Sequence, residues 1–316
     1  MLFTLYVDVL LARLKLSHLG CHIGNVFFGA VCYADDIALV APTITSLKLM
    51  LNICDDFGKE YDVIFNADKN QLLHYGISQK DEKLGYINHN NVKIPVSESA
   101  IHLGHCLGTS NRDVAINKGI NVFVSTLNGV INLFRNAHVH VKYKLFKTFC
   151  MPLYGCVLWD YSTLAMNKFF TQWRKGIRTL LNLPVRTHSR YIPLIIEDLP
   201  VEYQLYKRFL KFVHNLIKSE NKCISLCARL MFNGSSSAAS NNVNLICDKL
   251  KCSKYDIETI PNPCYKKLSA IVRDLYNEND LQQCGNIKDI LTIRDKNNTR
   301  LSYSEIDTLL NFFCTD

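Results

Sequence analysis

The sequence has no run of apolar residues long enough to cross a membrane, since none approaches the roughly eighteen uninterrupted apolar residues that a span needs. Its leucine-rich start, MLFTLYVDVLLARL, lacks a basic leader and carries Asp8 inside the apolar run, which is not typical of a secretory signal. We therefore expect no signal peptide and no membrane partner.

Paired cysteine spacing is also lacking. The 13 cysteines are an odd number and are scattered along the chain, which favours reduced thiols and an intracellular protein over a disulfide framework. Cys223, Cys227, Cys247 and Cys252 come nearest to a zinc cluster, but no histidine follows His214. Buried or surface thiols are the favoured interpretation, with an unusual zinc site as the alternative.

Acidic residues are scarce between His138 and Arg190. Asp160 is the single acid there against nine basic residues, so the segment carries nine minus one, or +8, which equals the net charge of the whole chain. Such a local excess of cations favours binding to nucleic-acid phosphates, with ordinary solubility as the alternative. The candidate nucleic-acid-binding residues are Lys142, Lys144, Lys147, Lys168, Arg174, Lys175, Arg178, Arg186 and Arg190.

Aromatic side chains are interleaved with these cations. They recur at helical spacing and aromatics are mostly buried, so we expect core residues rather than a platform for stacking bases. The set comprises Tyr143, Phe146, Phe149, Trp159, Phe169, Phe170 and Trp173.

Two adjacent aspartates, Asp35 and Asp36, interrupt an apolar stretch, CYADDIALV. The apolar runs on either side predict two strands buried on both faces and joined by a tight hairpin turn. Because like charges repel more strongly as the dielectric falls, a partly dry turn would need a nearby cation. Carboxylates on a rigid turn suit Mg²⁺, whereas the alternative is an ordinary polar turn.

Tyr33-Ala34-Asp35-Asp36 between two such strands resembles the catalytic turn of reverse transcriptases, and its surroundings resemble the LINE-type class encoded by retrotransposons without long terminal repeats. Other stretches are similar to further motifs of that family, in the expected order, over about residues 1–205. They are MLFTLYVD at residues 1–8 (template positioning), Phe57-Gly58 with FNADK at 65–69 (the next palm motif), HLGH at 102–105 (primer grip) and CMPLYG at 150–155 with Trp159 (beyond the thumb).

The resemblance implies RNA-directed DNA polymerisation with two Mg²⁺ ions. Asp35 and Asp36 would be catalytic metal ligands, and Lys69 would assist the phosphates of a dNTP, although an ordinary surface lysine is the alternative. The implied primer grip comprises His102, Leu103 and Gly104. The family's third carboxylate and its nucleotide-binding fingers would lie before this chain begins. The implied partners are an RNA template and a DNA primer, in the nucleus and/or cytoplasm.

The expected fold class is α+β. We expect a partial polymerase palm over residues 1–108, with an antiparallel sheet and helices on one face, then a helical thumb and basic connector over 109–220 and a polar helical tail over 221–316. Apolar periodicity predicts a helix through Leu47, Met50, Leu51, Cys54 and Phe57, a strand at 63–65, helices near 116–134, 142–150, 167–183 and 202–219, and a linker at 233–244.

Two functions remain open. The first is the C-terminal part of a LINE-type reverse transcriptase, truncated at its N-terminus and inactive alone. The alternative is a non-catalytic, retroelement-derived protein that binds nucleic acid through its basic segment.

Overall fold

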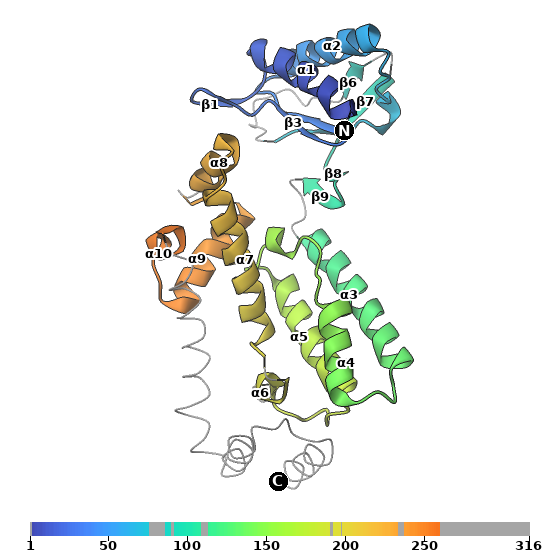
Figure 1. The fold of residues 1–316 in the computed structure, drawn as a ribbon, viewed down its shortest axis with the longest axis vertical. Coiled ribbons are helices and arrows are strands. Elements are labelled where there is room, and N and C mark those ends of the chain that lie inside the picture. Colours follow the sequence, from blue (N-terminus) through green and yellow to red (C-terminus); the bar gives the residue numbers. More distant parts are fainter. Residues whose placement is uncertain are drawn as a thin grey trace. The chain divides into compact units, whose positions relative to one another are not determined.

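The computed structural model describes residues 2–75, 86–89, 92–108, 113–189, 192–196, 198–232 and 237–259, which form a mixed α and β structure with small sheets (Figure 1). The expected mixture of helices and strands is confirmed. The chain divides into two compact units, unit 1 with Met1–Asn111 and Glu220–Leu226, and unit 2 with Arg112–Ser219 and Cys227–Asp316. The predicted division into palm, thumb and tail stays a prediction, and residues 109–112 and 260–316 lie outside the described part.

The strands of the described chain all belong to unit 1, in four small sheets. The single antiparallel sheet that we expected is not formed by these residues, because tight turns end each hairpin after a few residues and one strand pair is parallel. The two-stranded sheets are β1 (His22–Ile23) with β2 (Val26–Phe27), β3 (Ala30–Tyr33) with β4 (Asp36–Leu39), and β8 (Ser99–His102) with β9 (His105–Gly108). The three-stranded sheet has the order β5 (Leu72–Leu73), β7 (Val92–Ser97), β6 (Tyr86–His89), with β5 parallel to β7.

The first two hairpins are joined by backbone hydrogen bonds beside a close approach of two glycines. The Cys21 N–H donates to the Val40 carbonyl over 2.9 Å, and the Val40 N–H donates to the Gly29 carbonyl over 2.8 Å. A Cβ at Gly29 would lie 2.6 Å from the Cα of Gly20, closer than real Cβ contacts. Glycine at both positions therefore lets the two hairpins meet.

Helices α1 (Leu2–Leu16) and α2 (Ile44–Tyr61) cover these strands. The predicted α2 is confirmed, and it begins at Thr43, whose hydroxyl accepts a hydrogen bond from the Ser46 N–H over 3.1 Å. Its apolar residues serve two small cores. Met50, Cys54 and Phe57 pack with Leu10 and Leu14 of α1 and with the β3–β4 hairpin, whereas Ile44, Leu47 and Leu51 pack on Leu72, Ile87 and Ile94 of the three-stranded sheet.

The strand predicted at Val63, Ile64 and Phe65 is wrong. The chain leaves α2 through Asp62, which has a left-handed backbone (φ 54°), and the N–H of Val63 donates to the Gly58 carbonyl over 2.9 Å. The backbone N–H of Val63 is therefore used to end α2 and cannot pair with a strand. The chain then continues into a short 3₁₀ turn, η1 (Ala67–Lys69).

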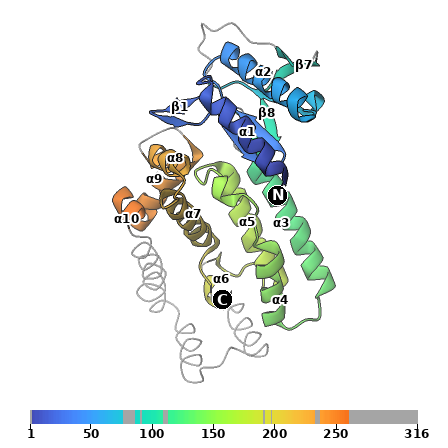
Figure 2. The ribbon, with the colours of Figure 1, turned by 45° about the horizontal axis from the view of Figure 1, so that its top comes forward.

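Unit 2 is helical in its described part. Its elements are α3 (Asp113–Leu133), α4 (Val139–Leu145) continuing into a π-helical turn η2 (Phe146–Cys150), a 3₁₀ turn η3 (Cys156–Leu158), α5 (Leu164–Leu180), α6 (Ile192–Ile196), α7 (Val201–Ile217), α9 (Ala238–Leu250) and α10 (Lys254–Thr259); α8 (Lys222–Phe232) contributes its last part. The four helices predicted between residues 116 and 219 are confirmed, with ends shifted by a few residues. Figure 2 shows α3 and α5 side by side.

The linker predicted at 233–244 is wrong from residue 238 onward, where α9 begins, while 233–236 lie outside the described residues. Ser237 caps α9 by accepting from the Ser240 N–H over 3.1 Å. Asn242 is fully buried, accepts from the Tyr161 N–H and donates to the Trp159 carbonyl, both over 2.7 Å. Two of the polar residues that suggested a linker therefore have structural roles: Ser237 caps α9, and Asn242 forms buried hydrogen bonds to the chain around Trp159.

The aromatic residues of the basic segment mostly form the core of unit 2, as predicted. Phe146, Trp159, Phe169, Phe170 and Trp173 are buried, whereas Phe149 is 57% exposed. Among the described helices, α3 alone is long and apolar enough to cross a membrane by length and composition. Ile116, Phe123, Leu127 and Val130 of α3 lie in this core, and 22% of its apolar window is buried.

Candidate functional site

The two aspartates lie at the tip of the β3–β4 hairpin, as predicted. Tyr33 pairs with Asp36, so Ala34 and Asp35 form a two-residue turn, and Ala34 takes the left-handed backbone (φ 53°) that such turns require. Asp36 is the first residue of β4. Both carboxylates are exposed.

The prediction of strands buried on both faces, and of a partly dry site, is wrong. Paired residues share a face, so Ala30, Cys32, Ile37 and Leu39 point to one side, and Ala30, Ile37 and Leu39 pack into the core with α1 and α2. The other face carries Val31, Tyr33, Asp36 and Ala38, and Val31 and Tyr33 are 55% and 66% exposed. No element in the described part of the chain covers these two residues, so the turn is open to water.

A third carboxylate acts near the hairpin. Burial raises the pKa of the Cys32 thiol, and the charges of Asp8, Asp35 and Asp36 raise that pKa further. Asp8 of α1 therefore lies within electrostatic range of the same strand. Among the described residues, however, no three acidic, histidine or cysteine side chains are close enough to share one metal ion.

The two aspartates suit a site for a single Mg²⁺ ion, but not a two-ion centre. Mg²⁺ is usually held by one or two carboxylates together with water and phosphate oxygens, so Asp35 and Asp36 fit a single ion of that kind. The described residues do not supply the carboxylates of a two-ion centre.

Lys69 and the predicted primer grip lie elsewhere in unit 1. Lys69 ends η1 and is exposed, and among the described residues it makes no ion pair with either hairpin aspartate. His102 pairs with His105, and Leu103 and Gly104 both have positive φ, at 49° and 77°, which closes a two-residue turn. The HLGH stretch is therefore a hairpin, as expected of a primer grip; its role stays a prediction.

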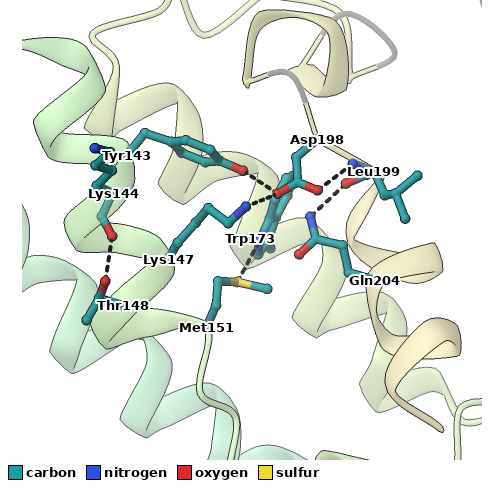
Figure 3. A network of polar contacts seen from close by, with 9 residues as sticks. All are labelled: Tyr143, Lys144, Lys147, Thr148, Met151, Trp173, Asp198, Leu199 and Gln204. Carbon is teal, nitrogen blue, oxygen red and sulfur yellow. Dashed lines mark hydrogen bonds and ion pairs between the residues drawn. The ribbon is translucent and has the colours of Figure 1, made fainter. Parts of the chain in front are cut away.

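The CMPLYG stretch is a structural part of the core of unit 2. Cys150, Met151 and Trp159 are buried, and Arg208 of α7 donates to the Met151 carbonyl over 2.6 Å. The indole N–H of Trp173 points to the Met151 sulfur at 3.3 Å (Figure 3). Through these contacts Met151 links α5 and α7.

Four of the nine predicted nucleic-acid-binding cations are either buried or bonded to other residues of the protein. Lys142 is only 7% exposed, and Lys147 pairs with Asp198 over 2.7 Å, although its side chain remains 53% exposed. Asp198 also accepts a hydrogen bond from Tyr143, whose pKa is raised by burial and by this carboxylate, and the network fixes the chain before α7 (Figure 3). The other two, Arg174 and Arg178, are tied by contacts to residues 187–202.

Arg174 forms an ion pair with Glu202, in which both side chains are largely covered. The guanidinium of Arg178 donates to the Thr187 carbonyl over 2.9 and 3.0 Å and to the Ser189 hydroxyl. Burial, followed by the charge of Arg174, lowers the pKa of Arg178. These two arginines hold the chain that follows α5.

The remaining cations are available at the surface of unit 2. Lys144, Lys168, Lys175 and Arg186 are exposed, and Arg190 lies outside the described residues. Lys168 also lines a shallow groove of about 380 Å³ between α3 and α5. The other lining residues are Asn117, Ile120, Asn121, Asn167, Thr171 and Gln172.

The groove and one buried cluster were missed from the sequence. The asparagines on α3 and α5 carried no signal, because amide residues on an exposed helix face are common. In unit 1, His89 of β6 is buried and bridges Asp55 of α2 over 2.8 Å and Asn70 over 3.0 Å. Only the fold brings these three residues together.

Comparisons with protein-family models, with curated proteins and with solved structures found no match for this chain.

Proposed function

We propose that this chain is the C-terminal part of a LINE-type reverse transcriptase, which polymerises DNA on an RNA template when complete. The observation that carries the proposal is the Tyr33-Ala34-Asp35-Asp36 sequence at the tip of a two-residue β-hairpin that packs on α1 and α2. The HLGH hairpin of the same unit supports it. In this proposal unit 1 holds part of the palm and unit 2 begins with the thumb.

Bound Mg²⁺ would neutralise charge on the attacking and leaving oxygens of nucleotidyl transfer. Asp35 and Asp36 would hold such an ion at the hairpin tip, where both are exposed to a substrate. A second ion would need another carboxylate in contact with them. We therefore expect the chain by itself to be inactive.

The test compares this chain with a version extended by its in-frame upstream codons. Each is purified and given a primed RNA template, Mg²⁺ and labelled dNTP. We expect no incorporation by the chain alone and incorporation by an extension that adds a strand aspartate, with Asp35→Ala removing the activity. An extended protein that binds the template yet stays inactive would contradict the polymerase proposal. Incorporation by the unextended chain that Asp35→Ala abolishes would refute the missing-ligand argument.

A non-catalytic nucleic-acid-binding protein is the second candidate. It is favoured by the open setting of Asp35 and Asp36 and by the absence, among described residues, of a three-ligand group around them. The exposed cations of unit 2 and the groove beside Lys168 would then be the functional surface. Stop codons immediately upstream would favour this candidate.

A further inference from the structure

The three-stranded sheet of unit 1 has one covered face and one open face. Its inward residues Leu72, Ile87 and Ile94 pack against α2, and the sheet lies beside that helix in Figure 1. Because successive residues alternate between faces, the outward positions are the intervening ones. Where β6 pairs with β7 they are Tyr86 and Asn88 on β6 and Lys93 and Pro95 on β7, and all four are exposed.

The strand register gathers these four side chains into one patch. Tyr86 lies directly opposite Pro95, and Asn88 lies directly opposite Lys93. The Lys93 ammonium lies 3.8 Å from the centre of the Tyr86 ring, which remains 44% exposed. Neither strand contains an acidic residue, so Lys93 is the one formal charge among the described strand residues on this face.

We propose that this open sheet face, through Tyr86, Asn88 and Lys93, is a binding site for single-stranded nucleic acid. An exposed aromatic ring on a sheet can stack on a base regardless of sequence. Because the Lys93 ammonium lies over one face of the Tyr86 ring, it would leave that face to a base and contact the neighbouring phosphate instead. The Asn88 amide offers both a donor and an acceptor to a base edge. Charge complementarity favours a polyanion over a second copy of this chain, whose net charge is +8.

The site differs from the basic surface of unit 2 and does not depend on polymerase activity. A cross-strand pair such as Tyr86 with Lys93 also occurs as a simple sheet-stabilising contact. The two roles differ in a measurable way. A stacking site needs the ring and touches the oligonucleotide, whereas a stabilising pair changes only the unfolding temperature.

The decisive measurement is photo-crosslinking of the full chain to oligouridylate and oligothymidylate that carry 5-iodouracil. Strands of about twenty nucleotides exceed the ~4–16 that one binding fold covers. We expect the crosslinked peptide to contain Tyr86. Tyr86→Leu should remove this crosslink and weaken binding about tenfold, within the range of one stacked base, whereas Tyr86→Phe should bind within about twofold of wild type. Lys93→Gln should reduce the salt slope by about 0.7.

The matched control is Tyr255→Leu, which alters a tyrosine that is 70% exposed in unit 2 and should change neither readout. Thermal unfolding of each variant confirms that it is folded. Unchanged binding and crosslinking in Tyr86→Leu overturns the proposal, as does a variant that changes only self-association. If Lys168→Ala with Lys175→Ala weakens binding while Tyr86→Leu does not, nucleic-acid binding by unit 2 stands and this inference fails. If the wild type binds no oligonucleotide, both fail.

Discussion

Helix α5 carries four cations of two kinds, which should respond differently to substitution. Lys168 and Lys175 are exposed, whereas Arg174 is paired with Glu202 and Arg178 is bonded to the Thr187 carbonyl. From the sequence, all four were candidates for contacting phosphates. The structure predicts instead that the lysines set the salt dependence of binding and the arginines set stability.

The magnitudes follow from the exposed cations between His138 and Arg190, leaving out Lys147, which is paired with Asp198. If Lys144, Lys168, Lys175 and Arg186 each contact one phosphate of a single strand, log K falls against log salt with a slope of about −2.8, at about −0.7 per contact. Binding then weakens about 50-fold between 50 and 200 mM salt. Removing the two lysines leaves a slope of about −1.4 and a loss of only about 7-fold over the same range.

The arginine pair provides the matched comparison on the same helix. Substituting Arg174 and Arg178 by glutamine removes charged hydrogen bonds, each worth about 1.5–3 kcal/mol, so the free energy of unfolding should fall while the salt slope stays near −2.8. Substituting Lys168 and Lys175 by alanine should change stability by less than about 0.5 kcal/mol. Fluorescence anisotropy on labelled single-stranded RNA at several salt concentrations, with urea unfolding of each variant, measures both quantities. A slope that responds to the arginines and not to the lysines would refute the reasoning.

Three further outcomes are expected. Gly129→Ala should raise the free energy of unfolding by about 0.5–1 kcal/mol, because a Cβ there meets open space inside helix α3, and urea unfolding measures it. Gly119→Ala in the same helix should lower it, because that Cβ would lie 2.4 Å from the Trp159 ring. Burial, with a smaller effect of the neighbouring Asp55, raises the pKa of Cys54 to about 12, so iodoacetamide should label the exposed Cys227 and leave Cys54 unmodified in the native protein. Because the folded pKa lies above the ordinary 9.0, the free energy of unfolding should fall as the pH rises from about 9 toward 12. Labelling of Cys54 without unfolding would contradict this.

Local patterns determined the elements of this protein. Helices α3, α5 and α7 could be predicted because apolar residues recur every three or four positions. For the start of α2 the sequence offered Thr43, Thr45 or Ser46 as the cap, and the structure selects Thr43. The β3–β4 turn was equally predictable, since a two-residue hairpin depends on the few residues that form it. These features rest on contacts between near neighbours in the chain, which a sequence shows directly.

Contacts between distant residues were decided only by the tertiary structure. Arg174 and Glu202 are 28 positions apart, and nothing in the basic pattern around Arg174 distinguishes a paired arginine from the exposed Lys175. The sequence around Asn242 predicted a linker, whereas in the fold its side-chain amide forms hydrogen bonds to the backbone of Trp159 and Tyr161, more than 80 residues away. Likewise, alternation along β3 and β4 could not show that one face lacks a covering layer. Composition supplies the charge of a surface, but which side chains remain free to use that charge depends on where the rest of the chain lies.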